Sequence, residues 1–342
     1  MSAIKISELL GDGIGPELRD AVHQVADVLP IELEFQPIDL SIENRRIAGV
    51  SVYDDAVESM RANRLALKYP TITEAESPNA VLRTRLDFSV IHRPVRSIEG
   101  IDSNFKHNVH VEIVRVATGG TYDDPGKMIG RDSAVSLRIV ERQPVFNAAH
   151  FAFQLARKRG FTVTSTSKHT IQRVTDGFFE SITRDVKLDY KDVHHKVELF
   201  DALLAKLILH PEDFQVVLCL NEYGDFLSDM ACGLVGSLGT GASANYSFNS
   251  DGHVEVAMFD PAGGTAPDIA GEDKANPTAV LLAFGMLLDH IDRRDLGRPL
   301  RRAIFELIEN GQCTADLRGA LSCSAFAEAV AANVKARIAA ES

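Results

Sequence analysis

The chain has 342 residues, room for about two domains at roughly 150 residues each. With 45% hydrophobic and 25% charged residues, its composition is that of an ordinary soluble protein. The net charge of −12 argues against a nucleic-acid partner, because phosphate binding requires clustered Lys and Arg. It is compatible with a small anionic substrate, since such a ligand responds to a local group of arginines rather than to the total charge.

Membrane and targeting signals are weak in this sequence. The longest apolar run, at about 279–288, is too short to cross a bilayer, so we expect no membrane segment. Residues 1–6 lead almost at once into a glycine-rich turn, which predicts that no signal or transit peptide precedes the fold. The four cysteines, at positions 219, 232, 313 and 323, form no Cys-x-x-Cys pair. They favour a reducing compartment, and we expect a cytoplasmic protein.

Strand-like and helix-like segments alternate along the chain, which predicts an α/β fold. The first helix follows the turn Gly11-Asp12-Gly13-Ile14-Gly15 and begins at Pro16, a residue suited to a first helical position. Apolar spacing predicts further helices at about 54–64, 147–159, 198–209, 277–288, 300–310 and 324–339. Short apolar or alternating runs predict strands at about 86–91, 109–115, 161–165, 216–218 and 254–259.

One segment, at about 133–143, has two interpretations. Its core, residues 134–142, alternates strongly between apolar and polar side chains but is flanked by polar loops. It can be an edge strand of the main sheet, or a protruding arm that pairs with another subunit. The sequence alone leaves both interpretations open.

An acidic pair follows the buried strand at 216–218. Asp225 and Asp229 are four residues apart in a predicted helix, so both carboxylates lie on one helical face. A hard divalent cation would convert their mutual repulsion into attraction. The position also suits a binding site, because open α/β sheets place their sites at the carboxyl ends of strands. A solvated acidic face is the simpler explanation for an isolated pair of this kind.

Four motifs occur in a fixed order along the chain, and the acidic pair belongs to one of them. They are Gly11-Asp12-Gly13-Ile14-Gly15-Pro16-Glu17, Arg115 with Thr118-Gly119-Gly120-Thr121-Tyr122, the stretch from Asn221 to Asp229, and Ala266-Pro267-Asp268-Ile269-Ala270-Gly271 with Ala275-Asn276-Pro277. Together they resemble the β-decarboxylating dehydrogenases, the family of isocitrate, isopropylmalate and homoisocitrate dehydrogenases. The resemblance extends over about residues 4–290.

This resemblance implies a two-domain α/β fold of the isopropylmalate-dehydrogenase type, with a mixed sheet shared between the domains. A standard Rossmann fold is not expected, because no Gly-x-Gly-x-x-Gly follows the first strand. The cofactor-binding domain would combine residues 1–98 and 236–342. The central domain would span 99–235 and carry the arm.

The resemblance also implies the chemistry. Family members oxidise a 2-hydroxy acid with a carboxylate on its third carbon, pass a hydride to a nicotinamide cofactor and release carbon dioxide. Asp225 and Asp229 match the family's ligands for Mg²⁺ or Mn²⁺, and Asp201 matches a third that a neighbouring subunit supplies. Tyr122 matches the residue that protonates the enol, and Lys168 matches a proton-transferring lysine from the neighbouring subunit. These assignments imply a homodimer with shared active sites.

Substrate recognition is implied for Arg83, Arg93 and Arg115, since the arginine fork binds carboxylates bidentately. Ser77 and Asn79 resemble the polar pair that holds the third acidic group of isocitrate, although Ser77-Pro78-Asn79 is also a good helix cap. A polar or anionic arm on the substrate is therefore expected, with isocitrate as the leading candidate. Isopropylmalate, homoisocitrate, malate, tartrate or a phosphonate-bearing analogue are the alternatives, as is a non-catalytic regulatory subunit.

Cofactor binding is implied for Gly264, Thr265, Ala266, Pro267, Asp268, Ile269 and Asn276. Asp268 would accept hydrogen bonds from the ribose hydroxyls and repel a 2′-phosphate, which favours NAD over NADP. Three positions depart from the family pattern, namely Val116, Thr170 and Gly263. They touch the nicotinamide side and the surroundings of the site rather than the metal-side acids or the arginines.

Overall fold

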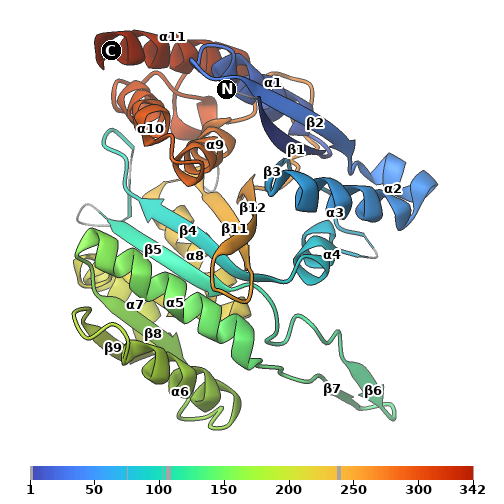
Figure 1. Ribbon diagram of the computed structural model, residues 1–342, viewed down its shortest axis with the longest axis vertical. Coiled ribbons are helices and arrows are strands. Elements are labelled where there is room, and N and C mark those ends of the chain that lie inside the picture. The colour runs from blue at the N-terminus through green and yellow to red at the C-terminus, as the bar shows by residue number, and fades with distance from the viewer. Residues whose placement is uncertain (1–2, 75, 102, 105–108, 237–239, 342) are drawn as a thin grey trace.

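A computed structural model describes residues 3–74, 76–101, 103–104, 109–236 and 240–341. Ten strands form one sheet in the order β2-β1-β3-β12-β11-β4-β5-β10-β8-β9 (Figure 1). Their bounds are β1 Ile4–Leu10, β2 Leu33–Asp39, β3 Leu65–Lys68, β4 Phe88–Arg96, β5 His110–Val116, β8 Val163–Ser167, β9 His195–Leu199, β10 Val216–Cys219, β11 Ala242–Phe248 and β12 Val254–Pro261.

The sheet consists of two parallel groups joined by antiparallel strands. Strand β11 runs antiparallel to both β12 and β4, and β4 runs antiparallel to β5. The remaining pairs in the ten-stranded sheet are parallel. The mixed α/β fold confirms the prediction, and the strand order differs from that of a standard Rossmann sheet.

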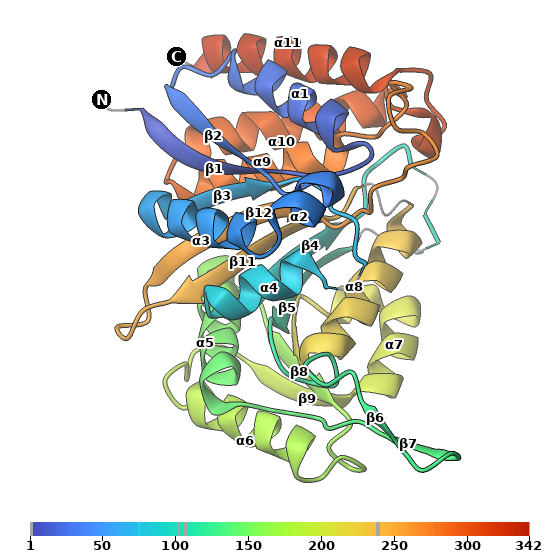
Figure 2. The same cartoon turned by 90° about the vertical axis from the view of Figure 1, so that its right-hand side faces the viewer.

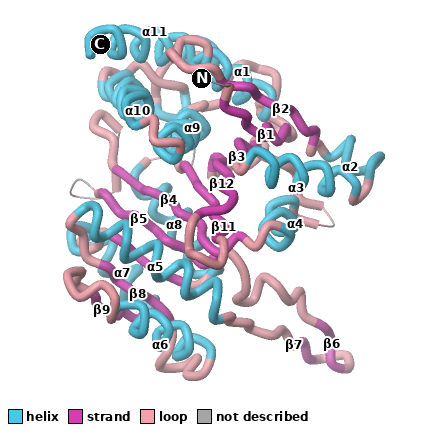
Figure 3. Tube along the Cα trace, in the orientation of Figure 1, coloured by secondary structure: helices cyan, strands magenta, loops and turns pink. Residues whose placement is uncertain are grey.

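Helices cover both faces of this sheet (Figures 1 and 3). They are α1 Gly15–Ala26, α2 Ile42–Ala48, α3 Ser51–Asn63, α4 Pro78–Arg85, α5 Arg142–Arg159, α6 Thr175–Lys187, α7 Phe200–Leu209, α8 Asn221–Val235, α9 Thr278–His290, α10 Arg294–Glu309 and α11 Cys323–Glu341. Within the described residues, no helix has the length and apolar character needed to cross a membrane.

Strand β5 shows how the two faces of the sheet are divided. Val114 and Val116 pack into the core that contains helix α5. Val111 and Ile113 face the other way, into a separate core formed with α7 and α8. Because successive strand residues point to opposite faces, Arg115 lies on the α8 side together with Ile113. Helices α5 and α8 therefore cover opposite faces of the same strands.

The segment at about 133–143 is not an edge strand of the main sheet. Residues Ser133–Val135 form β7, which pairs with β6, Lys127–Ile129, in a separate two-stranded ribbon. This ribbon protrudes from the body of the protein (Figure 2). The carboxylate of Asp124 accepts the backbone N–H groups of Gly126 and Leu137, which closes the base of the ribbon. The geometry agrees with the arm interpretation, while pairing with another subunit stays a prediction.

Candidate active site

The predicted arginines and the acidic pair meet on the α8 face of the sheet. Arg115 lies near the end of β5, Arg93 lies on the neighbouring β4, and Asp225 and Asp229 lie one turn apart on α8. Gly224 allows this close approach, because a Cβ there would lie 2.6 Å from the Cβ of Arg115. We call Arg83, Arg93, Arg115, Asp225 and Asp229 the arginine site.

Asp225 is at the centre of the arginine site. Its Oδ1 accepts hydrogen bonds from Nη1 of Arg115 and, at 3.5 Å, from Nη1 of Arg93. Its Oδ2 accepts the hydroxyl of Tyr122 at 3.0 Å. The same Nη1 of Arg93 lies 3.2 Å from Oδ1 of Asp229 and 2.7 Å from the hydroxyl of Ser228. One carboxylate therefore joins two arginines and the tyrosine predicted to act as an acid.

Arg83 reaches the site from helix α4. Its Nε donates to Oδ1 of Asn245 on β11 at 3.3 Å, and the amide of Asn245 donates to Asp260 on β12 at 3.0 Å. Asn79 precedes Arg83 by four residues and so shares its helical face. The Oδ1 of Asn79 is buried without a hydrogen-bond partner. Ser77 caps α4, since its hydroxyl accepts the N–H of Ala80 at 3.4 Å, so the cap interpretation is confirmed.

Electrostatics distinguish the members of the arginine site. Burial and the charge of Arg115 lower the pKa of Arg83 to about 9. Burial would raise the pKa of Asp225, but Arg115 and Arg93 outweigh it and lower the pKa overall. Burial raises the pKa of Asp229, with Arg93 opposing and Asp225 adding to the shift. Crowding of positive charges that lowers arginine pKa values is expected where an anion is to be bound.

Tyr122 is half exposed beside the arginine site. Burial and the charge of Asp225 raise its pKa to about 12, so the phenol keeps its proton at neutral pH. The guanidinium carbon of Arg115 lies 5.9 Å from the centre of the Tyr122 ring. A protonated phenol in contact with an acid and an arginine can donate a proton to a bound substrate.

Lys168 and Asp201 form a pair with each other rather than with the arginine site. The ammonium of Lys168 lies 2.6 Å from Oδ1 of Asp201. The backbone N–H of Lys168 donates to Asp176, which also accepts the hydroxyl of Tyr223. Tyr223 and Asp225 are two residues apart on α8 and thus point to different sides of the helix. In the part of the chain that is described, no group of three metal-ligating side chains occurs, so Asp201 does not join Asp225 and Asp229 within one chain.

The predicted cofactor loop lies against the glycine-rich turn at residues 11–15. The N–H of Ile14 donates to the carbonyl of Thr265, and a Cβ at Gly13 would lie 2.0 Å from that oxygen. Asp268 is exposed. The side chain of Asn276 is engaged, because its carbonyl accepts the N–H of Thr278 and its amide donates to Asp316.

The residues that hold the arginines in place were not among the predicted site residues. Asn221 accepts Nε of Arg115 at 2.9 Å and donates to the carbonyl of Gly119 at 3.0 Å. Asn245 accepts Nε of Arg83 and in turn donates to Asp260, from two strands that are distant from Arg83 in sequence. Asn221 belongs to the quoted motif, so its polar character at the start of a buried helix was the available signal. Asn245 carried no such signal.

The fold and the site together define a class: an α/β protein with a mixed ten-stranded sheet that brings arginines and a pair of aspartates together on one face. Residues 5–330 match the family model described as isocitrate/isopropylmalate dehydrogenase. The chain therefore belongs to the isocitrate/isopropylmalate dehydrogenase family, which confirms the predicted resemblance and the prediction of a decarboxylating dehydrogenase.

Individual relatives agree with this assignment. A probable NAD isocitrate dehydrogenase subunit alpha of Caenorhabditis elegans is 34% identical over 337 residues, covering 97% of this chain and 92% of that protein. Isocitrate dehydrogenase [NAD] subunit 2 of Saccharomyces cerevisiae is 34% identical over 336 residues, covering 95% and 89%. The crystal structure of isocitrate dehydrogenase from Methylococcus capsulatus has a TM-score of 0.88 and 32% identity, covering 97% of this chain and 99% of that one.

The relatives correct one prediction. The names of the Caenorhabditis elegans and Saccharomyces cerevisiae proteins include the word mitochondrial, which contradicts the expected cytoplasmic location. The four cysteines are free, and all four are buried. Free thiols indicate a reducing environment, but they do not distinguish one reducing compartment from another. The cysteine pattern was therefore an insufficient basis for that prediction.

Proposed function

We propose that this protein catalyses the NAD-dependent, divalent-metal-dependent oxidative decarboxylation of a 2-hydroxy-3-carboxy acid, with isocitrate as the leading substrate. The observation that carries the proposal is the convergence of Arg83, Arg93 and Arg115 on Asp225 and Asp229. The isocitrate specificity is suggested by the names of the relatives and by the polar residues of α4.

Binding of the substrate carboxylates is proposed for the three arginines. The Nε of Arg93 is buried and has no hydrogen-bond partner among the described residues, so it can donate to a carboxylate oxygen without losing a contact. Buried guanidinium groups are stabilised most by bidentate carboxylates. Asn79, whose buried carbonyl also lacks a partner, would accept a hydroxyl or a protonated group of the substrate's polar arm.

Asp225 and Asp229 fit a hard divalent cation, because carboxylate oxygens are the ligands that Mg²⁺ and Mn²⁺ prefer. When bound, the metal ion would supply positive charge beside the oxygen on which negative charge develops. Two carboxylates are an incomplete set. Asp201 of a second chain is proposed to complete it, because in its own chain Asp201 pairs with Lys168 away from the site. The proposal therefore includes a homodimer with shared active sites.

Proton transfer is proposed for Tyr122 and Lys168. Tyr122 would donate its phenolic proton to the substrate carbon after carbon dioxide leaves, since its raised pKa keeps the proton in place. Lys168 of the second chain, once it has given up a proton to become the neutral amine, would remove the hydroxyl proton. Its ammonium lies 2.6 Å from Asp201, so the two groups would enter the neighbouring site together.

NAD is proposed to bind along the loop from Gly264 to Ile269. Asp268 is exposed and can accept hydrogen bonds from ribose hydroxyls. Asn276 would exchange its contact with Asp316 for one with the adenine ring. The division of the chain into residues 1–98 plus 236–342 and residues 99–235 likewise stays a prediction.

The deciding experiment is a substrate panel with the purified full-length chain. Isocitrate, isopropylmalate, homoisocitrate, malate and tartrate would each be assayed with NAD or NADP, and with Mg²⁺ or Mn²⁺. We expect turnover of isocitrate with NAD only when a divalent ion is present. Absence of turnover with every acid would favour a non-catalytic regulatory subunit, and metal-independent turnover would contradict the metal assignment.

A further inference from the structure

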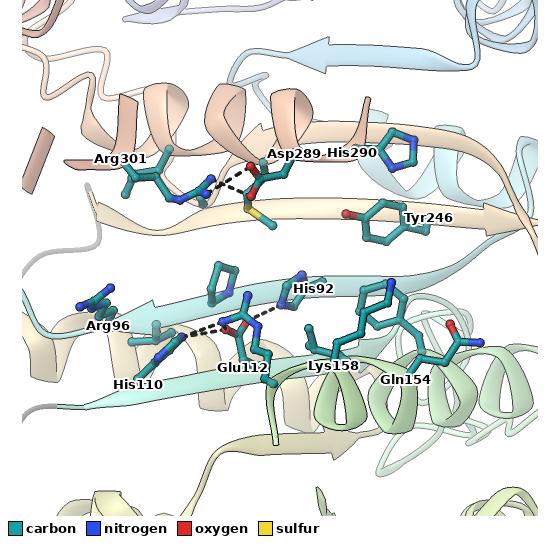
Figure 4. Close-up of a pocket in the computed structure, with 18 of the residues that line it drawn as sticks. His92, Arg96, His110, Glu112, Gln154, Lys158, Tyr246, Asp289, His290 and Arg301 are labelled. Atoms are coloured by element: carbon teal, nitrogen blue, oxygen red, sulfur yellow. Dashed lines mark hydrogen bonds and ion pairs between the residues drawn. The ribbon is translucent and has the colours of Figure 1, made fainter. Parts of the chain in front are cut away.

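A second cleft of about 1010 Å³ lies on the reverse face of the strands that carry the arginine site (Figure 4). His92 lines it from β4, where the next residue, Arg93, faces the arginine site. Tyr246 lines it from β11, where the preceding residue, Asn245, binds Arg83. The strand alternation therefore gives these two strands one site on each face. We call the second one the reverse cleft.

The wall formed by helix α5 presents a mixed surface to the reverse cleft. Phe151, Gln154, Leu155 and Lys158 all line it, and their spacing places them on a single helical face. Opposite them, α9 contributes Met286 and His290. One wall thus combines an aromatic ring, an aliphatic side chain, an amide and an ammonium group.

Three rings gather at one end of this cleft. The centre of the Tyr246 ring lies 5.2 Å from that of Phe151 and 5.8 Å from that of His290. Tyr246 is only 7% exposed, yet its hydroxyl has no hydrogen-bond partner among the described residues. The imidazole of His290 likewise makes ring contacts but no hydrogen bond within that part of the chain. Neither group is among the fully enclosed unpaired polar atoms, so both are reached from the cleft and a ligand can meet them without displacing a protein partner.

Cations without partners lie elsewhere along the same cleft. Within the described residues, Lys158 and Arg294 take part in no ion pair or hydrogen bond, and Arg96 only rests over the ring of Phe305, at 5.4 Å. These three cations line the cleft of a chain whose net charge is −12.

The carboxylates of the reverse cleft are of two kinds. Glu112 is enclosed by His92, His110 and Arg159, and Asp289 is paired with Arg301. Asp251 and Asp292 also line the cleft, and both are exposed. Glu112 and Asp289 are therefore already paired with cationic side chains, whereas Lys158 has no paired carboxylate among the described residues.

From these features we propose that the reverse cleft is a binding site for a planar aromatic anion. The aromatic part would lie against Phe151, Tyr246 and His290, where a ring nitrogen or oxygen can meet the free phenol. The anionic group would bind Lys158, which lies on the same α5 wall as Phe151. Aromatic stacking and one charge-assisted hydrogen bond are the interactions that such a ligand requires. This inference stands independently of the proposed dehydrogenase activity.

The probe for this site is 8-anilinonaphthalene-1-sulfonate, an aromatic sulfonate whose fluorescence reports binding directly. The full-length protein would be titrated with and without saturating NAD, so that binding at the dinucleotide loop can be separated. We expect saturable binding that NAD leaves unchanged. Lys158→Ala should weaken it about tenfold, Lys158→Arg by less than about twofold, and Tyr246→Phe about threefold.

Two controls make the test decisive. Lys335→Ala removes an exposed lysine on α11, outside the cleft, and should leave the affinity unchanged. Thermal melting would verify that Tyr246→Phe, which keeps the ring, remains folded. Loss of the fluorescence on adding NAD, equal affinity in Lys158→Ala and wild type, or absence of saturable binding would each overturn the proposal.

Discussion

The two faces of strands β4 and β5 differ in how completely their buried charges are paired. On one face, Arg93 and Arg115 share the carboxylate of Asp225, Arg93 also reaches Asp229, and the Nε of Arg93 has no acceptor among the described residues. On the other face, the fully buried Glu112 is surrounded by donors: His92 at 2.5 Å, His110 at 2.8 Å, and Arg159.

This difference separates a binding site from a structural group. The Glu112 cluster has a donor for each carboxylate oxygen, so a ligand could add nothing there without displacing a partner. The arginine site has more cationic capacity than its acids use, and burial together with the charge of Arg115 lowers the pKa of Arg83. Incomplete satisfaction of buried charges is the reason to expect an anion at the arginine site, whereas the anion proposed for the reverse cleft would bind Lys158 and not the Glu112 cluster.

The largest effect is expected from Asp229→Asn, which neutralises one of the two paired acids of the arginine site. We predict at least a roughly hundredfold fall in kcat with isocitrate, NAD and Mg²⁺, because the substituted amide is a weaker ligand for a hard cation. Steady-state kinetics would measure it, with Glu255→Gln on β12, an exposed acid, as the matched control. Near-normal turnover would refute the metal assignment.

The second-largest effect is expected at Glu112, on the other face of strands β4 and β5. Glu112→Gln should lower the free energy of unfolding by about 2 kcal/mol, because a buried carboxylate with three donors is replaced by an amide that must donate as well as accept. Urea unfolding would measure it. Glu34→Gln, at an exposed position on β2, should change stability by less than about 0.5 kcal/mol.

The Glu112 cluster should also make stability depend on pH. Burial would raise the pKa of Glu112, but hydrogen bonds from His110 and His92 and the charge of Arg159 hold it well below its usual range. The cluster's contribution is thus present above the unfolded pKa of about 4.3 and is lost as pH falls toward the folded pKa. Between pH 6 and pH 3, wild type should lose more stability than Glu112→Gln. Parallel curves for the two proteins would contradict this.

A smaller effect is expected from Asn245→Ala, which removes the acceptor that holds Arg83. We predict that KM for isocitrate rises about tenfold while kcat changes less, because Asn245 positions a substrate-binding group without itself carrying the reaction. Asn245→Asp keeps an acceptor for Arg83 but places a second carboxylate beside Asp260, so it should recover only part of the affinity. Equal KM values in wild type and Asn245→Ala would show that substrate binding does not depend on the hydrogen bond from Arg83 to Asn245.

The arginine site was predictable where its residues lie close in sequence or belong to specific motifs. Asp225 and Asp229 required only helical spacing, and Arg115 required only the end of a buried strand. Asn245 was missed because strand β11 reads Ala-Ser-Ala-Asn-Tyr-Ser-Phe, without the apolar run that marked the other buried strands. Its role depends on pairing with β4 and β12, and such distant pairings leave no local pattern.

The predicted starts of two helices were wrong for similar reasons. The helix predicted at 198–209 begins at Phe200, because His195–Leu199 pairs with β8 instead. The helix predicted from 300 begins at Arg294 and contains Pro299 inside it. Pro299 is the sixth residue of α10 and lies beyond its first turn, so the helix gives up the hydrogen bond that an N–H at this position would make to the carbonyl of Asp295. The sequence did not decide between an edge strand and an arm at about 133–143, because alternation predicts a strand but not the strand with which it pairs.

The smallest predicted effect tests the two roles of Ser77, which the structure confirms only as a helix cap. Ser77→Asp keeps a capping oxygen at the start of α4 and adds a negative charge favourable to the helix terminus, so stability should hold or rise slightly. If Ser77 also faces the substrate, the added carboxylate should repel an anionic arm and raise KM for isocitrate about threefold. Ser77→Ala gives the opposite pattern, with a loss of about 0.5 kcal/mol in stability and little change in KM. An unchanged KM in Ser77→Asp would limit Ser77 to capping and leave Asn79 alone to recognise the polar arm.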